Sequence, residues 1–415
     1  MAVQYKLSAE ELKQYYNSAD EVRLGPGWVG REHEKPPELE PYMWRWSDVE
    51  PLVLKSGDVV TPDQDVERRI MRLATPGLER GTTHTMVAAL QLLLPGETAP
   101  SHRHTPTAIR WILKGEGAYT TVEGDKCWME PGDLILTPSW TWHDHTNEGN
   151  QPMIWLDGLD VPLVGYLKAN FYEQFPEDTQ PVNGTGDSIK KFASGTLRPT
   201  WEQPDLAYSP LLHYKWDKTY EALQNLAELG SDPFDDVAME YSDPTTGGPV
   251  LRTMTCWVQL IRPGVRTKAH RHTSSKIYQV FKGEGYSVIN GQRFDWAEGD
   301  FLVVPSWAWH EHAAADGKEA ILFSIQDTPI MKSMALYREE PYVEHGGNQP
   351  VTSRFSVGTP VEPQTSEGTK FRHTSAESWN PHDSAVCFPS YPVGQSTIGG
   401  ALLNPPNIVL PVAAE

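Results

Sequence analysis

An internal repeat is the feature that most constrains how this chain can fold. Residues 101–145 read "SHRHTPTAIRWILKGEGAYTTVEGDKCWMEPGDLILTPSWTWHDH", and residues 269–312 read "AHRHTSSKIYQVFKGEGYSVINGQRFDWAEGDFLVVPSWAWHEH". Both stretches contain HRHT, KGEG, a GD pair, PSW and WHxH in the same order, with a single one-residue gap between them. Such ordered agreement does not arise by chance, so the chain carries two copies of one domain.

Each copy is predicted to form an all-β barrel or jelly roll. Its sequence consists of short apolar or alternating runs, such as "AYTTVEG" and "LILTPSW", that are cut by glycine and proline. This pattern is typical of many short strands joined by tight turns. The pair Asn290-Gly291 is a strong signal for a hairpin turn.

Helices are expected outside the two repeats. Ser8 and Glu11 in "SAEELKQYY" fit a capping box, and residues 218–230 fit a helix that ends at Gly230. The predicted division of the chain is a helical and irregular arm (1–60), a first barrel (61–175), a connector with a helix (176–240), a second barrel (241–340) and an irregular or disordered tail (341–415).

Composition and charge narrow the class of protein. Hydrophobic residues make up 39% of the 415 residues, and no apolar run approaches the ~20 residues of a membrane span. The net charge of −20 argues against nucleic acid and anionic membrane as partners, although a local arginine can still hold a small anion. The first residues show no leader-like pattern and the three cysteines form no CxxC pair, so a cytoplasmic location is expected.

The histidines follow the repeat. Eight of the fourteen occupy matching places in the two copies, namely His102, His104, His143, His145, His270, His272, His310 and His312. Residues two apart in a strand point to the same side, so His102 and His104 share one face of their strand. Imidazole suits Fe(II), Zn, Ni and Cu. Two histidines on one strand and a third on a distant strand can therefore close on one face of a metal ion.

These motifs resemble those of the cupin superfamily in its two-domain form. In the first copy the matching residues are Gly96, His102, His104, Gly132, Pro138 and His143. In the second copy they are Gly264, His270, His272, Gly299, Pro305 and His310. The resemblance implies two tandem cupin barrels with a few peripheral helices.

One departure from the usual cupin pattern changes the expected chemistry. The glutamate that normally follows the second histidine is missing, because those positions are Ala108 and Ile109 in the first copy and Lys276 and Ile277 in the second. Three neutral histidines leave the full +2 charge on a metal ion and about three coordination positions free. Such a site favours an anionic chelating substrate and keeps a place for O₂.

With this departure, the chain resembles the gentisate 1,2-dioxygenase family, which also includes salicylate and 1-hydroxy-2-naphthoate dioxygenases. The resemblance covers roughly residues 40–340 and includes "GDLILTPSWTWHDHTN" and "WLDGLDVPL". It implies an Fe(II)-dependent enzyme that cleaves the ring of an ortho-hydroxylated aromatic carboxylate with O₂. Gentisate, giving maleylpyruvate, is the first expectation, with salicylate or 1-hydroxy-2-naphthoate as alternatives. A homo-oligomer, and a tetramer in particular, is also implied by the resemblance.

The resemblance assigns roles to residues of the first copy. His102, His104 and His143 are the expected Fe(II) ligands. Arg110 is expected to bind the substrate carboxylate, because a guanidinium matches a carboxylate in a two-pronged way. His145 is expected near the substrate hydroxyls as an acid or base.

Further pocket positions follow from the same resemblance. Gln91 and Asp157 match family pocket residues, and Arg69, with its neighbour Arg68 as the alternative, is expected to add positive charge. The tryptophans of the motifs (Trp111, Trp140 and Trp142) are expected to pack the barrel.

No GxGxxG unit or P-loop is present, which fits a reaction that needs neither NADH nor flavin.

The second copy keeps its metal set but not its substrate residues. His270, His272 and His310 are all present, yet Tyr278 stands where Arg110 stands and Ser324 corresponds to Asp157. The second copy could be another active site, a metal-stabilised structural barrel or a degenerate pocket. We favour a site that binds metal but is weaker in catalysis.

Two other functions compete with ring cleavage. A bicupin decarboxylase or isomerase that uses Mn, Ni or Zn is disfavoured by the missing glutamates and by Arg110 with the WHDH motif. A non-enzymatic storage bicupin needs no metal set, so the six matched ligand histidines argue against it.

Overall fold

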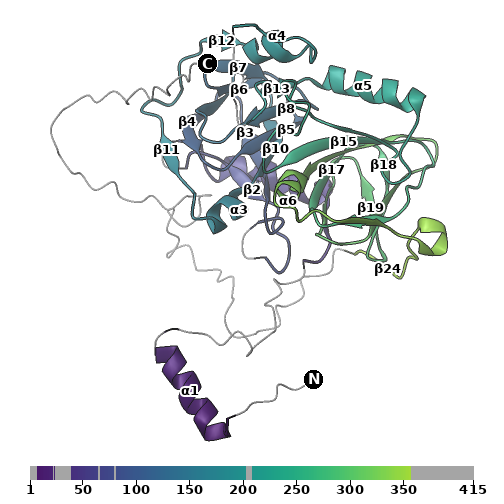
Figure 1. Ribbon diagram of the computed structural model, residues 1–415. Helices are drawn as coiled ribbons and strands as arrows, with labels where there is room; N and C mark the ends of the chain where they lie inside the picture. Colours follow the sequence, from purple (N-terminus) through teal and green to yellow (C-terminus); the bar gives the residue numbers. More distant parts are fainter. Residues whose placement is uncertain are drawn as a thin grey trace, which may run out of the picture. The chain divides into compact units, whose positions relative to one another are not determined.

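The structure is a computed structural model that describes residues 7–21, 23, 39–63, 66–78, 81–201 and 208–356. Within these residues the chain forms four six-stranded sheets, two from each repeat. Figure 1 shows the strands of the first repeat in blue to teal and those of the second repeat in green. Residues 357–415 lie outside the described residues, and so does most of the predicted tail.

The first barrel consists of two sheets that face each other. In spatial order, one sheet contains β13 (His213–Tyr214), β8 (Leu134–Thr137), β5 (Ala108–Lys114), β10 (Met153–Leu159), β3 (Val87–Leu93) and β2 (Ile70–Arg72). The other contains β11 (Tyr172–Gln174), β4 (Thr98–His104), β9 (His143–Asn147), β6 (Ala118–Val122), β7 (Asp125–Trp128) and β12 (Gly184–Thr185).

The second barrel repeats this arrangement strand for strand. One sheet contains β1 (Tyr42–Trp44), β20 (Phe301–Val304), β17 (Lys276–Lys282), β22 (Ala320–Gln326), β15 (Thr255–Ile261) and β14 (Val237–Glu240). The other contains β23 (Glu339–Pro341), β16 (His270–His272), β21 (His310–Ala314), β18 (Glu284–Ile289), β19 (Gln292–Ala297) and β24 (Ser353–Arg354). The predicted pair of all-β barrels is confirmed.

The turn and helix predictions are confirmed as well. Asn290 and Gly291 both have positive φ, 48° and 79°, as a tight hairpin turn between β18 and β19 requires. Ser8 and Glu11 bond reciprocally at the start of α1 (Ala9–Glu21), as in a capping box. Helix α5 (Trp216–Leu229) ends at Gly230, as its sequence indicates.

The remaining helices are short and lie between strands. They are α2 (Trp46–Lys55), the 3₁₀ turn η1 (Ser56–Asp58), α3 (Val161–Tyr166), α4 (Asp187–Phe192), α6 (Thr328–Ser333) and η2 (Glu344–Gly347). Among the described residues, no helix combines the length and the apolar character needed to cross a membrane.

Each barrel is completed by an exchanged strand, which lies outside the repeats and directly precedes the other barrel along the chain. Strand β1 precedes the first barrel but pairs with β20 of the second, and β13 precedes the second barrel but pairs with β8 of the first. The aspartate of each GD pair accepts a hydrogen bond from the first residue of the helix that follows the exchanged strand. The carboxylate of Asp300 accepts a hydrogen bond from Trp46 N at 2.8 Å, and Asp133 accepts one from Trp216 N at 2.9 Å.

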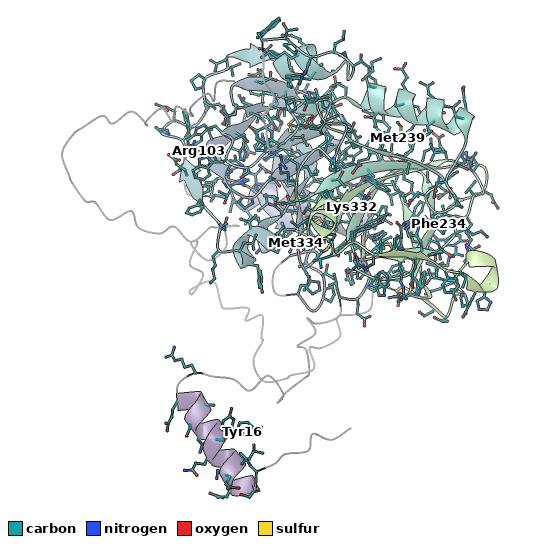
Figure 2. The ribbon with its side chains drawn as sticks, viewed as in Figure 1. Tyr16, Arg103, Phe234, Met239, Lys332 and Met334 are labelled. Carbon is teal, nitrogen blue, oxygen red and sulfur yellow. The ribbon has the colours of Figure 1, made fainter. Side chains whose placement is uncertain are left out.

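The main core spans both barrels. The ring of Trp111 stacks on Phe323 with 4.1 Å between centroids, and its Nε1 donates to Gln279 Oε1. The predicted packing role of Trp111 is thereby confirmed. Trp140 and Trp142 instead pack against Arg103 of the first barrel, which is labelled in Figure 2. The guanidinium carbon of Arg103 lies 4.5 Å from the ring centroid of Trp140 and 4.4 Å from that of Trp142.

Candidate metal centre and active site

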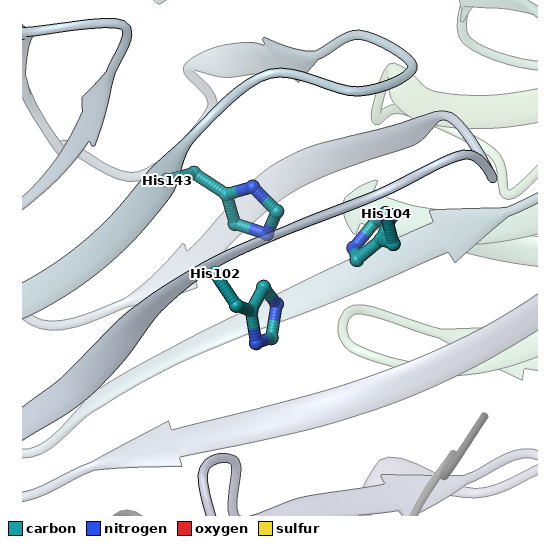
Figure 3. Close-up of side chains that lie close together, drawn as sticks. All are labelled: His102, His104 and His143. Atoms are coloured by element: carbon teal, nitrogen blue, oxygen red, sulfur yellow. The ribbon is translucent and has the colours of Figure 1, made fainter. Parts of the chain in front are cut away.

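Three histidines of the first barrel meet where β4 and β9 pair. His102 and His104 alternate on β4, and His143 lies opposite His102 on β9. An irregularity between Ala99 and His102 shifts the register of β4, which sets His102 directly against His143. One ligand nitrogen from each ring lies within 4.8 Å of the other two, and Figure 3 shows the rings converging.

Backbone carbonyl oxygens just outside β4 and β9 lie within hydrogen-bond distance of Nδ1 in two of the three rings. His104 Nδ1 lies 2.7 Å from the Pro106 carbonyl oxygen, and His143 Nδ1 lies 3.0 Å from the Thr141 carbonyl oxygen. A carbonyl oxygen can only accept, so both Nδ1 atoms carry the proton. The remaining nitrogen, Nε2, is then unprotonated in the neutral ring and able to bind a metal ion.

The donor set fits a divalent transition metal. His143 Nε2 is buried and has no hydrogen-bond partner within the residues that the structure describes. Burial lowers the pKa of His104 to about 4 and that of His143 well below its usual value, so both rings are neutral ligands near neutral pH. The group that could hold a metal contains three histidines and no carboxylate, as the sequence predicts. Imidazole ligands of this kind suit ferrous iron.

Arg110 lies in the barrel interior, on β5. Its neighbour across the sheet is Asp157 on β10, whose Oδ1 is 3.4 Å from Arg110 Nε, and the arginine also donates to Thr137 Oγ1. Arg110 Nε makes no hydrogen bond to any described residue, although its side chain is only 3% exposed. Burial lowers the pKa of Arg110 to about 10 and raises that of Asp157 to about 6. The guanidinium is therefore charged and has spare capacity for a carboxylate.

His145 and Gln91 add polar atoms to the same interior. His145 is fully buried, its ring centroid is 6.1 Å from that of His143, and its Nε2 has no partner. Its Nδ1 lies 2.8 Å from Thr120 Oγ1, and that hydroxyl is placed to donate to Met129 Sδ. If the hydroxyl proton goes to sulfur, His145 Nδ1 is the donor and Nε2 an acceptor. Gln91 Nε2 is also buried without a partner.

Comparisons with known proteins agree with this geometry. A family model described as the cupin domain matches residues 89–160 and 257–326. The chain is 41% identical over 344 residues to a 5-aminosalicylate 1,2-dioxygenase of Comamonas sp, covering 80% of this chain and 91% of that relative. It is 34% identical to gentisate 1,2 dioxygenase 1 of Aquipseudomonas alcaligenes, covering 80% of this chain and 96% of that one.

A solved structure matches the fold over the same span. The crystal structure of salicylate 1,2-dioxygenase from Pseudoaminobacter salicylatoxidans with gentisate aligns with a TM-score of 0.75 and 34% identity, covering 82% of this chain and 96% of that chain. The chain belongs to the gentisate 1,2-dioxygenase family. It is thus a ring-cleaving dioxygenase with two cupin barrels, and the predicted family is confirmed.

Of the two adjacent arginines, the structure brings Arg68 rather than Arg69 to the site. Arg69 bonds to both carboxylate oxygens of Glu97, at 2.8 and 2.6 Å, and to the Val60 carbonyl oxygen. Arg68 donates to the carbonyl oxygens of Pro100 and His143, and its charge contributes to the lowered pKa of His143. Arg68 and Arg69 lie in the irregular segment just before β2, and sequence alone does not tell which of the two faces the site.

Two residues of this gentisate 1,2-dioxygenase family site were missed by the sequence analysis. Glu67 Oε2 lies 3.1 Å from His102 Nδ1, and Tyr172 donates a short hydrogen bond to the other oxygen of Glu67. Glu67 comes from the segment before β2, and Tyr172 from β11. They lie 35 and 70 residues from His102 along the chain, and no local pattern marks them.

The second barrel of this family member holds a matching triad. His270, His272 and His310 also place one ligand nitrogen each within 4.8 Å of the others. Their ring centroids are 4.4, 4.9 and 5.5 Å apart, against 4.6, 4.9 and 5.3 Å in the first barrel. The Nε2 atoms of all three rings are buried, and the described part of the chain offers them no hydrogen-bond partner.

Proposed function

We propose that this enzyme uses Fe(II) in its first barrel to cleave gentisate with O₂, giving maleylpyruvate with both oxygen atoms incorporated. The observation that carries the proposal is a buried, incompletely paired Arg110 beside a triad of histidines without a carboxylate. A guanidinium in such a place costs free energy unless an anion joins it. Asp157 supplies part of that negative charge from 3.4 Å, and a substrate carboxylate would supply the hydrogen-bond acceptors that Arg110 still lacks.

The chain's own residues then have separate tasks. His102, His104 and His143 would hold the iron, which supplies a charged centre where the substrate oxygens and O₂ can meet. Arg110 binds the substrate carboxylate and fixes the orientation of the ring. With the Thr120 hydroxyl donating to Met129 Sδ and the His145 Nδ1 proton directed to Thr120, His145 Nε2 would accept the proton of a ring hydroxyl. Arg68 adds positive charge on the side of His143, and Gln91 offers a buried donor to the ring.

A second candidate substrate is 5-aminosalicylate. The 41% identical relative carries that substrate in its name, and the compound differs from gentisate only in having an amino group in place of the 5-hydroxyl. Both substrates can form a hydrogen bond at the 5-position, which salicylate cannot. A site that bonds this group discriminates strongly against the analogue that lacks it.

Oxygen uptake tests the proposed activity. The full chain is loaded with Fe(II) without air, and O₂ consumption is then followed with gentisate, 5-aminosalicylate, salicylate and 1-hydroxy-2-naphthoate. We expect one O₂ per gentisate and the highest kcat/KM for gentisate. A higher kcat/KM for salicylate or 1-hydroxy-2-naphthoate would contradict the proposed substrate, and no uptake with any of the four would contradict the proposed chemistry.

Arg110→Gln tests the carboxylate contact. We expect kcat/KM for gentisate to fall about 100-fold, because a charge-assisted hydrogen bond in a buried site contributes about 2–3 kcal/mol. The matched control is Arg69→Gln, which removes a buried arginine outside the site. That variant should lose stability in urea while its KM stays near that of the wild type. Equal effects of the two substitutions on KM would count against the assignment of Arg110.

A further inference from the structure

A buried lysine distinguishes the interior of the second barrel. Lys276, the first residue of β17, is 2% exposed and occupies the place that Ala108 has in the first barrel. The closest carboxylate oxygen of a described residue, Asp235 Oδ1, is 3.9 Å from Nζ, which is too far for a hydrogen bond. Burying an ammonium group is costly unless an anion and hydrogen-bond acceptors surround it. The described residues supply this lysine with an incomplete set of acceptors.

Two further donors lie near the same ammonium group. Nζ of Lys276 is 5.1 Å from the ring centroid of Trp257 and 5.9 Å from that of Tyr278. Trp257 Nε1 and the Tyr278 hydroxyl are both buried and have no hydrogen-bond partner among the described residues. An indole N–H can only donate, and a buried phenol keeps its proton to donate. Three donors without adequate acceptors therefore lie on one side of the barrel interior.

These donors and the second histidine triad share one interior. The Tyr278 ring centroid is 4.8 Å from that of His312, which is 5.9 Å from that of His310. The charge of Lys276 also contributes to the lowered pKa of His310. Aromatic rings limit the space, since Phe234, labelled in Figure 2, has its centroid 5.2 Å from that of His270. Tyr278 itself fills the position that Arg110 has in the first barrel.

We propose that the second barrel binds a divalent metal ion together with a small carboxylate. His270, His272 and His310 hold the metal through Nε2, and Lys276 with Tyr278 and Trp257 holds the carboxylate. The ligand is smaller than an aromatic acid, because Trp257 and Lys276 take the places that the much smaller Ala89 and Ala108 have in the first barrel. The site is a binding site that stands independently of the ring-cleavage proposal.

Metal content gives the first test, because the chain offers a matched pair of variants. His104 and His272 occupy equivalent places, and each has Nδ1 bonded to a carbonyl oxygen two residues later. The full chain and its variants are loaded with Co(II), freed of excess metal, and assayed for cobalt per chain. We expect two ions in the wild type, one in His104→Ala, one in His272→Ala and none in the double variant. Wild-type protein that holds one ion, with no loss in His272→Ala, would overturn the proposal.

Acetate titration gives the second test. In His104→Ala protein, only the second barrel is expected to hold Co(II), so the cobalt absorption spectrum comes from that site alone. Acetate binding is followed through changes in this spectrum, with chloride of equal ionic strength as the control. We expect Lys276→Met to weaken acetate binding at least about tenfold while cobalt per chain stays the same. The control is Lys282→Met on the same strand, whose lysine is exposed and pairs with Glu319. It should leave acetate affinity unchanged.

A third variant keeps the test decisive if Lys276→Met does not fold. Tyr278→Phe removes a single buried oxygen and should weaken acetate binding about threefold or more. Acetate affinities that are equal in the wild type and in every folded variant of Lys276 or Tyr278 would overturn the carboxylate part. A cobalt spectrum that does not respond to acetate would overturn it as well. Loss of gentisate turnover with both results intact would affect only the ring-cleavage proposal.

Discussion

At the scale of single residues, the atoms behind the histidine rings distinguish the two barrels. His102 Nδ1 has a carboxylate partner in Glu67, whereas His270 Nδ1 has no hydrogen-bond partner in the described ranges of the chain. The residue that corresponds to Glu67 by strand register is Asp235, which lies toward Lys276 instead. A carboxylate behind a ligand histidine fixes the ring and raises its basicity. The first triad is therefore better prepared for a metal ion.

Replacing Glu67 should weaken metal binding in the first barrel. In a His272→Ala chain, where only the first barrel reports, we expect Glu67→Gln to reduce Co(II) affinity about 10-fold or more. Competition with a chelator of known affinity measures the Co(II) affinity of each protein. Glu173→Gln is the control, because that carboxylate pairs with Arg103 and is half-exposed. An unchanged Co(II) affinity in Glu67→Gln would show that the contact does not position His102.

The pairing of Asp157 with Arg110 predicts how KM depends on pH. Burial raises the pKa of Asp157 to about 6, so its carboxylate is ionised above that pH and neutral below it. The ionised form competes with the substrate carboxylate for Arg110. We therefore expect the KM for gentisate to rise as the pH increases through about 6, and Asp157→Asn to remove that rise. A KM profile that is the same in both proteins would contradict this competition.

At the scale of elements, the exchanged strands depend on two glycines of the repeat. A Cβ on Gly299 would lie 2.4 Å from Trp46 Cγ, and one on Gly132 would lie 2.6 Å from Trp216 Cγ. Each tryptophan begins the helix that follows an exchanged strand. The GD pair in the repeat therefore serves two purposes: the glycine leaves room for the indole, and the aspartate accepts the backbone N–H of the same tryptophan.

Gly299→Ala should destabilise the fold more than the same substitution at Gly96, a glycine with a similar φ. Gly299 has φ of 92° and Gly96 has φ of 79°, but a Cβ on Gly96 would meet nothing within 4 Å. We expect Gly96→Ala to cost about 1 kcal/mol from backbone strain alone. Gly299→Ala should cost about 2 kcal/mol more, because the indole must move. Urea unfolding measures both, and equal losses would indicate that Trp46 adapts without cost.

At the scale of the whole molecule, the repeat in the sequence was sufficient to predict two barrels and both histidine triads. Alternation along a strand places His102 and His104 together whatever surrounds them. The exchange of β1 and β13 was not predictable, because the sequence pattern of each strand would equally allow it to pair with the barrel that directly follows it. Glu67 and Lys276 were missed as site residues for a similar reason. Their roles depend on which segments the closed barrels bring together.

The location of iron tests the central claim most directly. Crystals of the full chain are grown with Fe(II) in the absence of air, and anomalous diffraction is recorded on both sides of the iron absorption edge. We predict a peak in the first barrel bonded to the Nε2 atoms of His102, His104 and His143, with no protein carboxylate as a ligand. A first barrel without an iron peak, or an iron ion with an oxygen of Glu67 or Asp157 among its ligands, would contradict the account.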